Sequence, residues 1–98
     1  MQHADLAALR RLDSLLQALR GQAALVEKSA GCFYLKSKAF LHFHVEADDL
    51  YADVKLHGDS FSRCRITTPD EQTRLLAEIE ARLQSGAPVP AAGAARRR

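Results

Sequence analysis

The sequence predicts an α+β fold, in which an N-terminal helix precedes an antiparallel meander of three or four strands and a C-terminal helix. Three observations predict it. Leucines recur at steps of three or four residues over 5–20, as on one face of a helix. Residues 33–56 alternate between apolar and polar, as in strands with one buried face. A helix-start signal then appears at Thr68.

The clearest element is a pair of strands at 39–45 and 50–57. Their apolar and polar residues alternate. Residues 46–49 between them, of which three are acidic, favour a hairpin loop, because aspartate side chains bond the local backbone in turns. If Val45 pairs with Leu50, the apolar side chains of both strands lie on one face and the polar side chains on the other. A slip of one residue would place apolar side chains opposite polar ones. The register that follows pairs Leu41 with Val54, Phe43 with Ala52, His42 with Asp53 and His44 with Tyr51.

The N-terminal helix is predicted over Asp5–Arg20. Asp5 can cap its first turn, and Gly21 stands where a left-handed terminating residue is expected. The stripe that would face the core consists of Leu6, Leu9, Leu12, Leu16 and Leu19.

Shorter segments complete the meander. We predict a strand at 23–28, which pairs through a glycine-containing turn with the strand around Cys32 and 33–35. Residues 36–38 form the next turn. Residues 61–66 are predicted to form a short edge strand or an extended connection, and their two arginines suit an edge.

The C-terminal helix begins with a capping box, in which the Thr68 hydroxyl and the Glu71 carboxylate satisfy each other's backbone amides and Pro69 occupies the first helical position. Gly86 and Pro88 end the helix. Residues 87–98 are small and contain proline and glycine, so we expect a disordered tail after a single α+β domain at 1–86. The buried stripe of the helix is Leu75, Leu76, Ile79 and Leu83.

Composition narrows the class of protein. A chain of 98 residues with 47% hydrophobic residues can bury one core. The net charge is +2, and without the three arginines at 96–98 it would be −1, unlike a dedicated nucleic-acid binder. Cys32 and Cys64 lack metal-binding spacing, so we expect reduced thiols in a cytoplasmic protein. No run is long enough to span a membrane.

The pattern FLHFH, then ADVKL, then a helix that starts at TTP resembles a group of small bacterial proteins of about this length. The resemblance covers most of residues 25–85. It implies a bacterial source and a single compact domain, and it carries no activity with it.

One polar constellation stands out on the predicted sheet. His42 and His44 share a face, and the register brings Asp53 beside His42. Two histidines and a carboxylate suit zinc or iron. His57 would lie about 13 Å along the strand from Asp53, at about 3.3 Å per residue, and is too far to join them. We expect His42 to be a structural histidine, either paired with Asp53 or simply solvated, without a bound metal ion. The alternative is a metal site or acid–base catalysis at His42, His44 and Asp53.

Two further surfaces are candidates. Lys36, Lys38 and Lys55 with aromatic residues near by could bind a nucleic acid weakly, although the acidic loop beside them opposes it. Phe33, Leu35 and Phe40 would form an apolar patch on the same face, which predicts a homodimer interface. Because no complete catalytic or cofactor motif is present, we expect a binding or assembly module more than an enzyme.

Overall fold

The computed structural model describes residues 2–85, and the tail expected at 87–98 lies outside them. The α+β class with an antiparallel sheet between terminal helices is confirmed. In chain order the elements are β1 (Gln2–His3), α1 (Leu6–Arg11), α2 (Asp13–Arg20), β2 (Leu25–Ser29), β3 (Cys32–Leu35), β4 (Lys38–Glu46), β5 (Asp49–Val54), β6 (Ser62–Arg65) and α3 (Pro69–Ser85).

The sheet has more strands than the three or four predicted. Strands β2 to β6 lie in sequence order and every neighbouring pair is antiparallel. These are already five strands, and a sixth, β1, pairs with β4 through Gln2↔Val45 and His3↔His44. Two residues are too few to show a period of two, so the sequence pattern could not predict β1.

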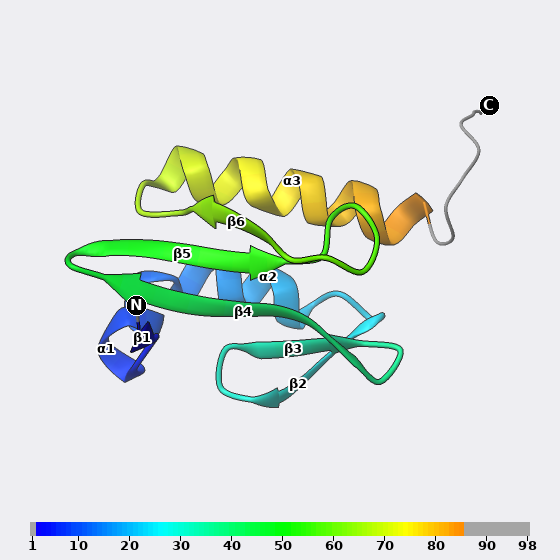
Figure 1. Ribbon diagram of the computed structural model, residues 1–98, viewed down its shortest axis with the longest axis horizontal. Helices are drawn as coiled ribbons and strands as arrows, with labels where there is room; N and C mark the ends of the chain where they lie inside the picture. The colour runs from blue at the N-terminus through cyan, green and yellow to red at the C-terminus, as the bar shows by residue number, and fades with distance from the viewer. Residues whose placement is uncertain (1, 86–98) are drawn as a thin grey trace.

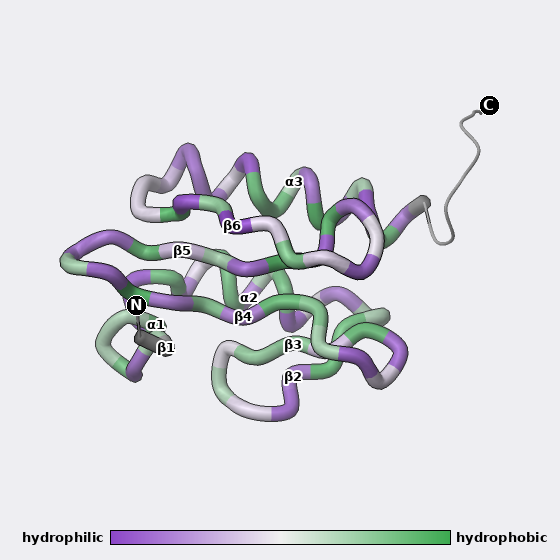
Figure 2. Tube along the Cα trace, viewed as in Figure 1, coloured by the Kyte–Doolittle hydropathy of each residue, from purple (hydrophilic) through white to green (hydrophobic). Residues whose placement is uncertain are grey.

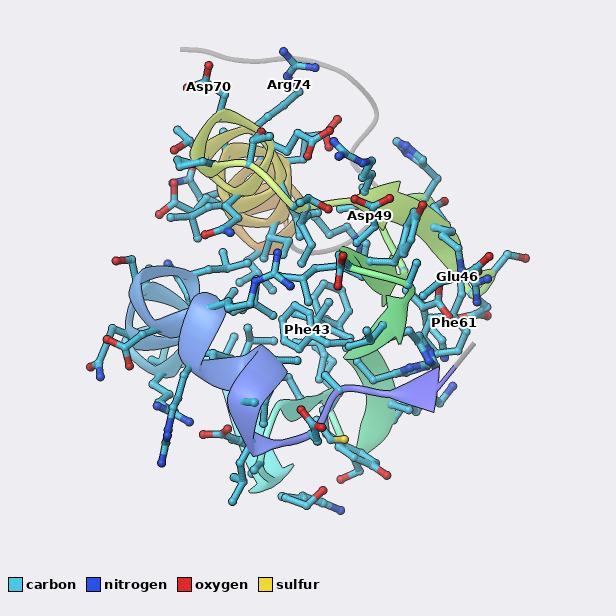
Figure 3. All side chains as sticks on the ribbon, turned by 90° about the vertical axis from the view of Figure 1, so that its left-hand side faces the viewer. Phe43, Glu46, Asp49, Phe61, Asp70 and Arg74 are labelled. Carbon is cyan, nitrogen blue, oxygen red and sulfur yellow. The ribbon has the colours of Figure 1, made fainter. Side chains whose placement is uncertain are left out.

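The three helices lie on one side of the sheet, and its other face is left open by them (Figures 1 and 3). Figure 3 shows Phe43 pointing from the sheet toward the helices, and Phe61 on the opposite side. The core lies between the two layers and includes Leu12, Leu19, Ile66 and Ile79, each 0% exposed. Each such side chain contributes about 1.5–3 kcal/mol through its removal from water. None of the helices in residues 2–85 is both long and apolar enough to cross a membrane.

The N-terminal helix is broken where one continuous helix was predicted. Asp5 does cap it, accepting a hydrogen bond from the Ala8 amide at 2.9 Å. Leu12, however, has φ −105° and ψ 16°, and separates α1 from α2. Leu6 is 70% exposed, so the buried stripe begins only at Leu9. Gly21 does follow the last helical residue, as predicted, but its φ of −78° is right-handed and not left-handed; its amide donates to the carbonyls of residues 17 and 18.

The central hairpin confirms the predicted register throughout. Leu41 pairs with Val54, His42 with Asp53, and His44 with Tyr51. The strands extend one pair beyond Val45↔Leu50, to Glu46↔Asp49, and leave a two-residue turn in which Ala47 has φ 55°.

The β3–β4 connection explains why the predicted apolar interface is wrong. Lys36 and Ser37 form a two-residue turn with φ of 53° and 70°, and the register shifts between Phe33 and Tyr34. Phe33 pairs with Leu41 and Tyr34 with Ala39, so Phe40 is the additional residue of a β-bulge, which re-aims side chains. Phe33 and Phe40 are each 1% exposed within this chain's own core, and Leu35 packs against it. The three residues therefore form no exposed patch.

The start of α3 follows the predicted capping box. The Glu71 amide donates to Thr68 Oγ1 at 3.2 Å, and the Thr68 amide donates to Glu71 Oε1 at 3.0 Å. Hydrophobic and hydrophilic segments alternate along the helix (Figure 2). Leu75 and Ile79 are buried and Leu76 and Leu83 are partly buried, as the stripe predicted.

Candidate functional site

Two neighbouring strands place the predicted polar residues together on the sheet face opposite the core. His42 and His44 alternate with the buried Leu41 and Phe43 along β4, and Asp53 lies directly across from His42 on β5. Because successive strand residues point to opposite faces, burying the apolar set fixes both imidazoles on the outer side. We call His42, His44 and Asp53 the histidine–aspartate site.

The two imidazoles contact each other as well as the carboxylate. His42 Nδ1 lies 2.9 Å from His44 Nε2, and His44 Nε2 lies 3.0 Å from Asp53 Oδ2. The sequence predicted a His42–Asp53 pair from the backbone register, and the structure has an ion-pair contact between Asp53 and His44, which lies two pairs further along β4. The His44 side chain therefore leans along its strand toward Asp53, and the pairing of Cα atoms alone could not predict that.

Arg63 holds the carboxylate and was missed at the sequence level. Its Nε donates to Asp53 Oδ1 at 2.8 Å and its Nη2 donates to Oδ2 at 2.9 Å, which is a two-pronged contact from the neighbouring strand β6. These hydrogen bonds lower the pKa of Asp53, assisted by the charge of Arg63, against a burial effect that would raise it. Asp53 is 8% exposed and is therefore a buried carboxylate locked in one orientation.

The geometry can hold a metal ion. His42, His44 and Asp53 each offer one ligand atom, and these atoms all lie within 4.8 Å of one another. His57 is exposed and is not part of this group, as its position along the chain predicted. The β1–β4 register also brings the Cα of His3 opposite that of His44.

An aromatic ring borders the site on the outer face. The Phe61 ring lies edge-on to His42 with the ring centroids 5.0 Å apart. Lys55 Nζ lies 5.1 Å from the centroid of the same ring. Phe61 is 43% exposed, so it bounds the site without closing it.

The three lysines of the predicted nucleic-acid surface also come together, around a pocket of about 280 Å³. Of the three aromatic residues that were expected to stack bases, Tyr51 is partly exposed, but Phe33 and Phe40 cannot serve that purpose. Phe33 and Phe40 are each 1% exposed, and a base cannot stack on a ring that the core covers. The structure therefore retains the positive charge of that hypothesis but buries two of its three stacking rings. The lining residues include Lys36, Lys38 and Lys55.

Comparisons with protein-family models, with curated proteins and with solved structures found no match to this chain.

Proposed function

We propose that this protein binds a divalent transition metal ion, with zinc as the best fit, at the histidine–aspartate site. The observation that carries the proposal is the convergence of two imidazole nitrogens and one carboxylate oxygen within 4.8 Å. From the sequence we preferred a structural His42, and the side-chain geometry changes that order of preference. The protein remains a binding protein in this proposal, now with a stated ligand.

The hydrogen positions available at the site favour a cation. His44 Nε2 carries either one proton or one lone pair, yet it makes short contacts with both a carboxylate oxygen and the Nδ1 of His42. If His42 Nδ1 donates to His44 Nε2, then Nε2 is an acceptor, and it faces a second acceptor, Asp53 Oδ2, at 3.0 Å. If His44 donates instead, one proton serves two acceptors. A metal ion at the centre would satisfy all three lone pairs at once.

The distances and ligand types suit zinc. Zinc binds imidazole nitrogen and carboxylate oxygen at about 2.0–2.2 Å with tetrahedral geometry, which sets neighbouring ligand atoms about 3.3 Å apart. The two contacts of 2.9 and 3.0 Å would open by a few tenths of an ångström to reach that spacing. The remaining pair of ligand atoms, which lies within 4.8 Å, would have to close toward it. Three protein ligands leave a fourth position for water or a ligand.

Arg63 fits the role of a supporting residue for the metal site. Outer-shell partners fix the orientation of ligating groups, and Arg63 orients the carboxylate through both of its oxygens. Each carboxylate oxygen has two lone pairs, so Oδ2 can accept from Arg63 and still face His44. The positive charge of Arg63 offsets the negative charge of Asp53. We therefore expect the site to bind zinc more weakly than a site rich in carboxylates.

Zinc binding by untagged protein tests the proposal. Isothermal titration calorimetry of the metal-free protein should show one zinc equivalent, and zinc at 100 times its Kd should stabilise the fold by about 2.7 kcal/mol. His42→Ala and His44→Ala should each remove the binding. His57→Ala is the matched control, because that histidine is exposed and outside the site. Spectra of each variant should show the wild-type fold before the result is used.

Two results would overturn the proposal: an absence of stoichiometric zinc binding, or binding that persists in both His42→Ala and His44→Ala. His3→Ala belongs in the same series because of the β1–β4 register, and weaker zinc binding in it would extend the site to β1. The homodimer, the bacterial source and the cytoplasmic location stay predictions.

A further inference from the structure

A second site of different chemistry lies where the β3–β4 turn, the end of β5, the loop at 56–60 and the last turns of α3 meet. Elements distant in the sequence enclose a pocket there of about 280 Å³, close to the lower end of the range for small-molecule sites. We call it the lysine pocket. It is lined by Ala24, Leu35, Lys36, Lys38, Ala39, Phe40, Lys55, Gly58, Asp59, Arg82 and Leu83.

The charge around this pocket is mostly positive. Its lining contains Lys36, Lys38, Lys55 and Arg82, against the single carboxylate of Asp59. The C-terminal end of a helix carries a partial negative charge, which would oppose an anion, but Arg82 lies in the last turn of α3 and offsets it. The two-residue turn holds Lys36 and Lys38 on either side of Ser37. The rim therefore attracts anions.

The floor of the pocket is apolar. Leu35 and Leu83 pack against the core, and Phe40, which belongs to it, is 1% exposed. A bare inorganic anion would use the rim and leave this floor in contact with water. A ligand that buries an apolar body as well gains the hydrophobic contribution in addition.

Lys55 separates this pocket from the metal site. Its ammonium lies over one side of the exposed Phe61 ring, and that ring contacts His42. Lys55 lines the pocket, whereas Phe61 and the side chains of the histidine–aspartate site do not. Binding at the pocket can therefore be tested with the metal absent.

We infer that the lysine pocket binds a small organic phosphate with an apolar or aromatic body. The lysines and Arg82 recognise the phosphate group, since ammonium and guanidinium groups make strong charge-assisted hydrogen bonds to phosphate oxygens. Leu35 and Leu83, which are only partly buried, contact the apolar body. A nucleic acid is the weaker candidate because Phe33 and Phe40, two of the three rings expected to stack its bases, are buried.

Phenyl phosphate is the probe, and the full chain in metal-depleted buffer is titrated with it by ¹H–¹⁵N NMR. The amides at 35–40, 55–59 and 82–83 should shift together and saturate. Inorganic phosphate has the charged group without the ring, and phenol has the ring without the phosphate group. Both should therefore bind more weakly than phenyl phosphate. Added salt should weaken the binding of phenyl phosphate through screening.

Charge-neutral variants assign the binding to the pocket. Lys38→Gln and Lys55→Gln should each raise the Kd roughly fivefold, because a charge-assisted contact to phosphate is lost. Lys28→Gln is the matched control: Lys28 is an exposed lysine on β2, next to the Tyr34 ring and outside the pocket lining. Its Kd should equal that of the wild type.

The inference is overturned if phenyl phosphate shifts no pocket amide, if phenol binds as tightly as phenyl phosphate, or if Lys28→Gln weakens binding as much as Lys55→Gln. It is also overturned if a single-stranded oligonucleotide binds through the same lysines while phenyl phosphate does not. That last result would restore the nucleic-acid hypothesis.

Discussion

We predict that Glu27 makes a large contribution to the stability of the protein, although it lies on the edge strand β2. Its carboxylate accepts two hydrogen bonds from Arg20, at 2.6 and 3.0 Å, and a third at 2.9 Å from the amide of Gly31. Gly31 is buried and has φ 77°, so its amide lies in the tight β2–β3 turn. Glu27 thus ties the end of α2 to the turn that follows β2.

The magnitude follows mainly from the Gly31 amide. Glu27→Ala leaves that buried N–H without its acceptor, which costs about 1–3 kcal/mol. Loss of the ion pair adds little, because the Arg20 side chain is 42% exposed and solvent screens the pair. For a domain of this size, a loss of about 2 kcal/mol lowers the Tm by about 8–16 °C.

Thermal and urea unfolding of three variants separate the two contributions. Glu27→Ala should lose the most stability, and Arg20→Gln clearly less. Glu27→Gln should fall between them, since its amide oxygen can still accept from Gly31. The reasoning is refuted if Glu27→Ala melts within about 2 °C of the wild type, or if Arg20→Gln is as destabilised as Glu27→Ala.

The pH dependence provides a second check on Glu27. Its hydrogen bonds from Arg20, more than any other cause, hold its pKa below the ordinary 4.5. A lowered folded-state pKa means that the ionised carboxylate stabilises the protein above the unfolded pKa, and that this stability is lost as the pH falls through the folded value. The difference between wild type and Glu27→Gln should therefore be largest near neutral pH and shrink below about pH 4.

Two further predictions concern α3 and the thiols. Thr68→Ala should cost about 1 kcal/mol in urea unfolding, because it removes the acceptor for the Glu71 amide; an unchanged midpoint would mean that the cap contributes nothing. Burial, more than the nearby carboxylates, raises the pKa of the Cys64 thiol, so Cys64 should react with iodoacetamide at pH 8 more slowly in the native protein than in urea, and equal rates, followed by mass spectrometry, would contradict this.

How far the sequence predicted the fold depended on how many residues carried each signal. The β4–β5 register was predictable, because six alternating pairs allow only one arrangement that buries a single face. The bulge at Phe40 was not, because a register shift follows from packing of Phe33, Phe40 and Leu41 into one core. The break at Leu12 likewise leaves no mark on a leucine spacing that suits a continuous helix.

The residues of the candidate site also fall into those that the sequence could predict and those that it could not. His42, His44 and Asp53 were predictable because they lie on one hairpin whose short turn sets the register. Arg63 was not, because the connection at 55–61 between β5 and β6 is long and fixes no pairing. The lysine pocket needed the last turns of α3, whose docking position the sequence does not encode locally.

The sequence order of the strands has a consequence for how the chain folds. Each of β2 to β6 pairs with its immediate neighbour along the chain, so the sheet can grow by adding one hairpin at a time. Such local pairing keeps the entropy cost of loop closure small, and proteins rich in local contacts reach the native state fastest. Only β1 must join β4 across some forty intervening residues. The strand beside His44 should therefore be the last to gain protection from amide exchange during refolding, after the meander that holds both sites has formed.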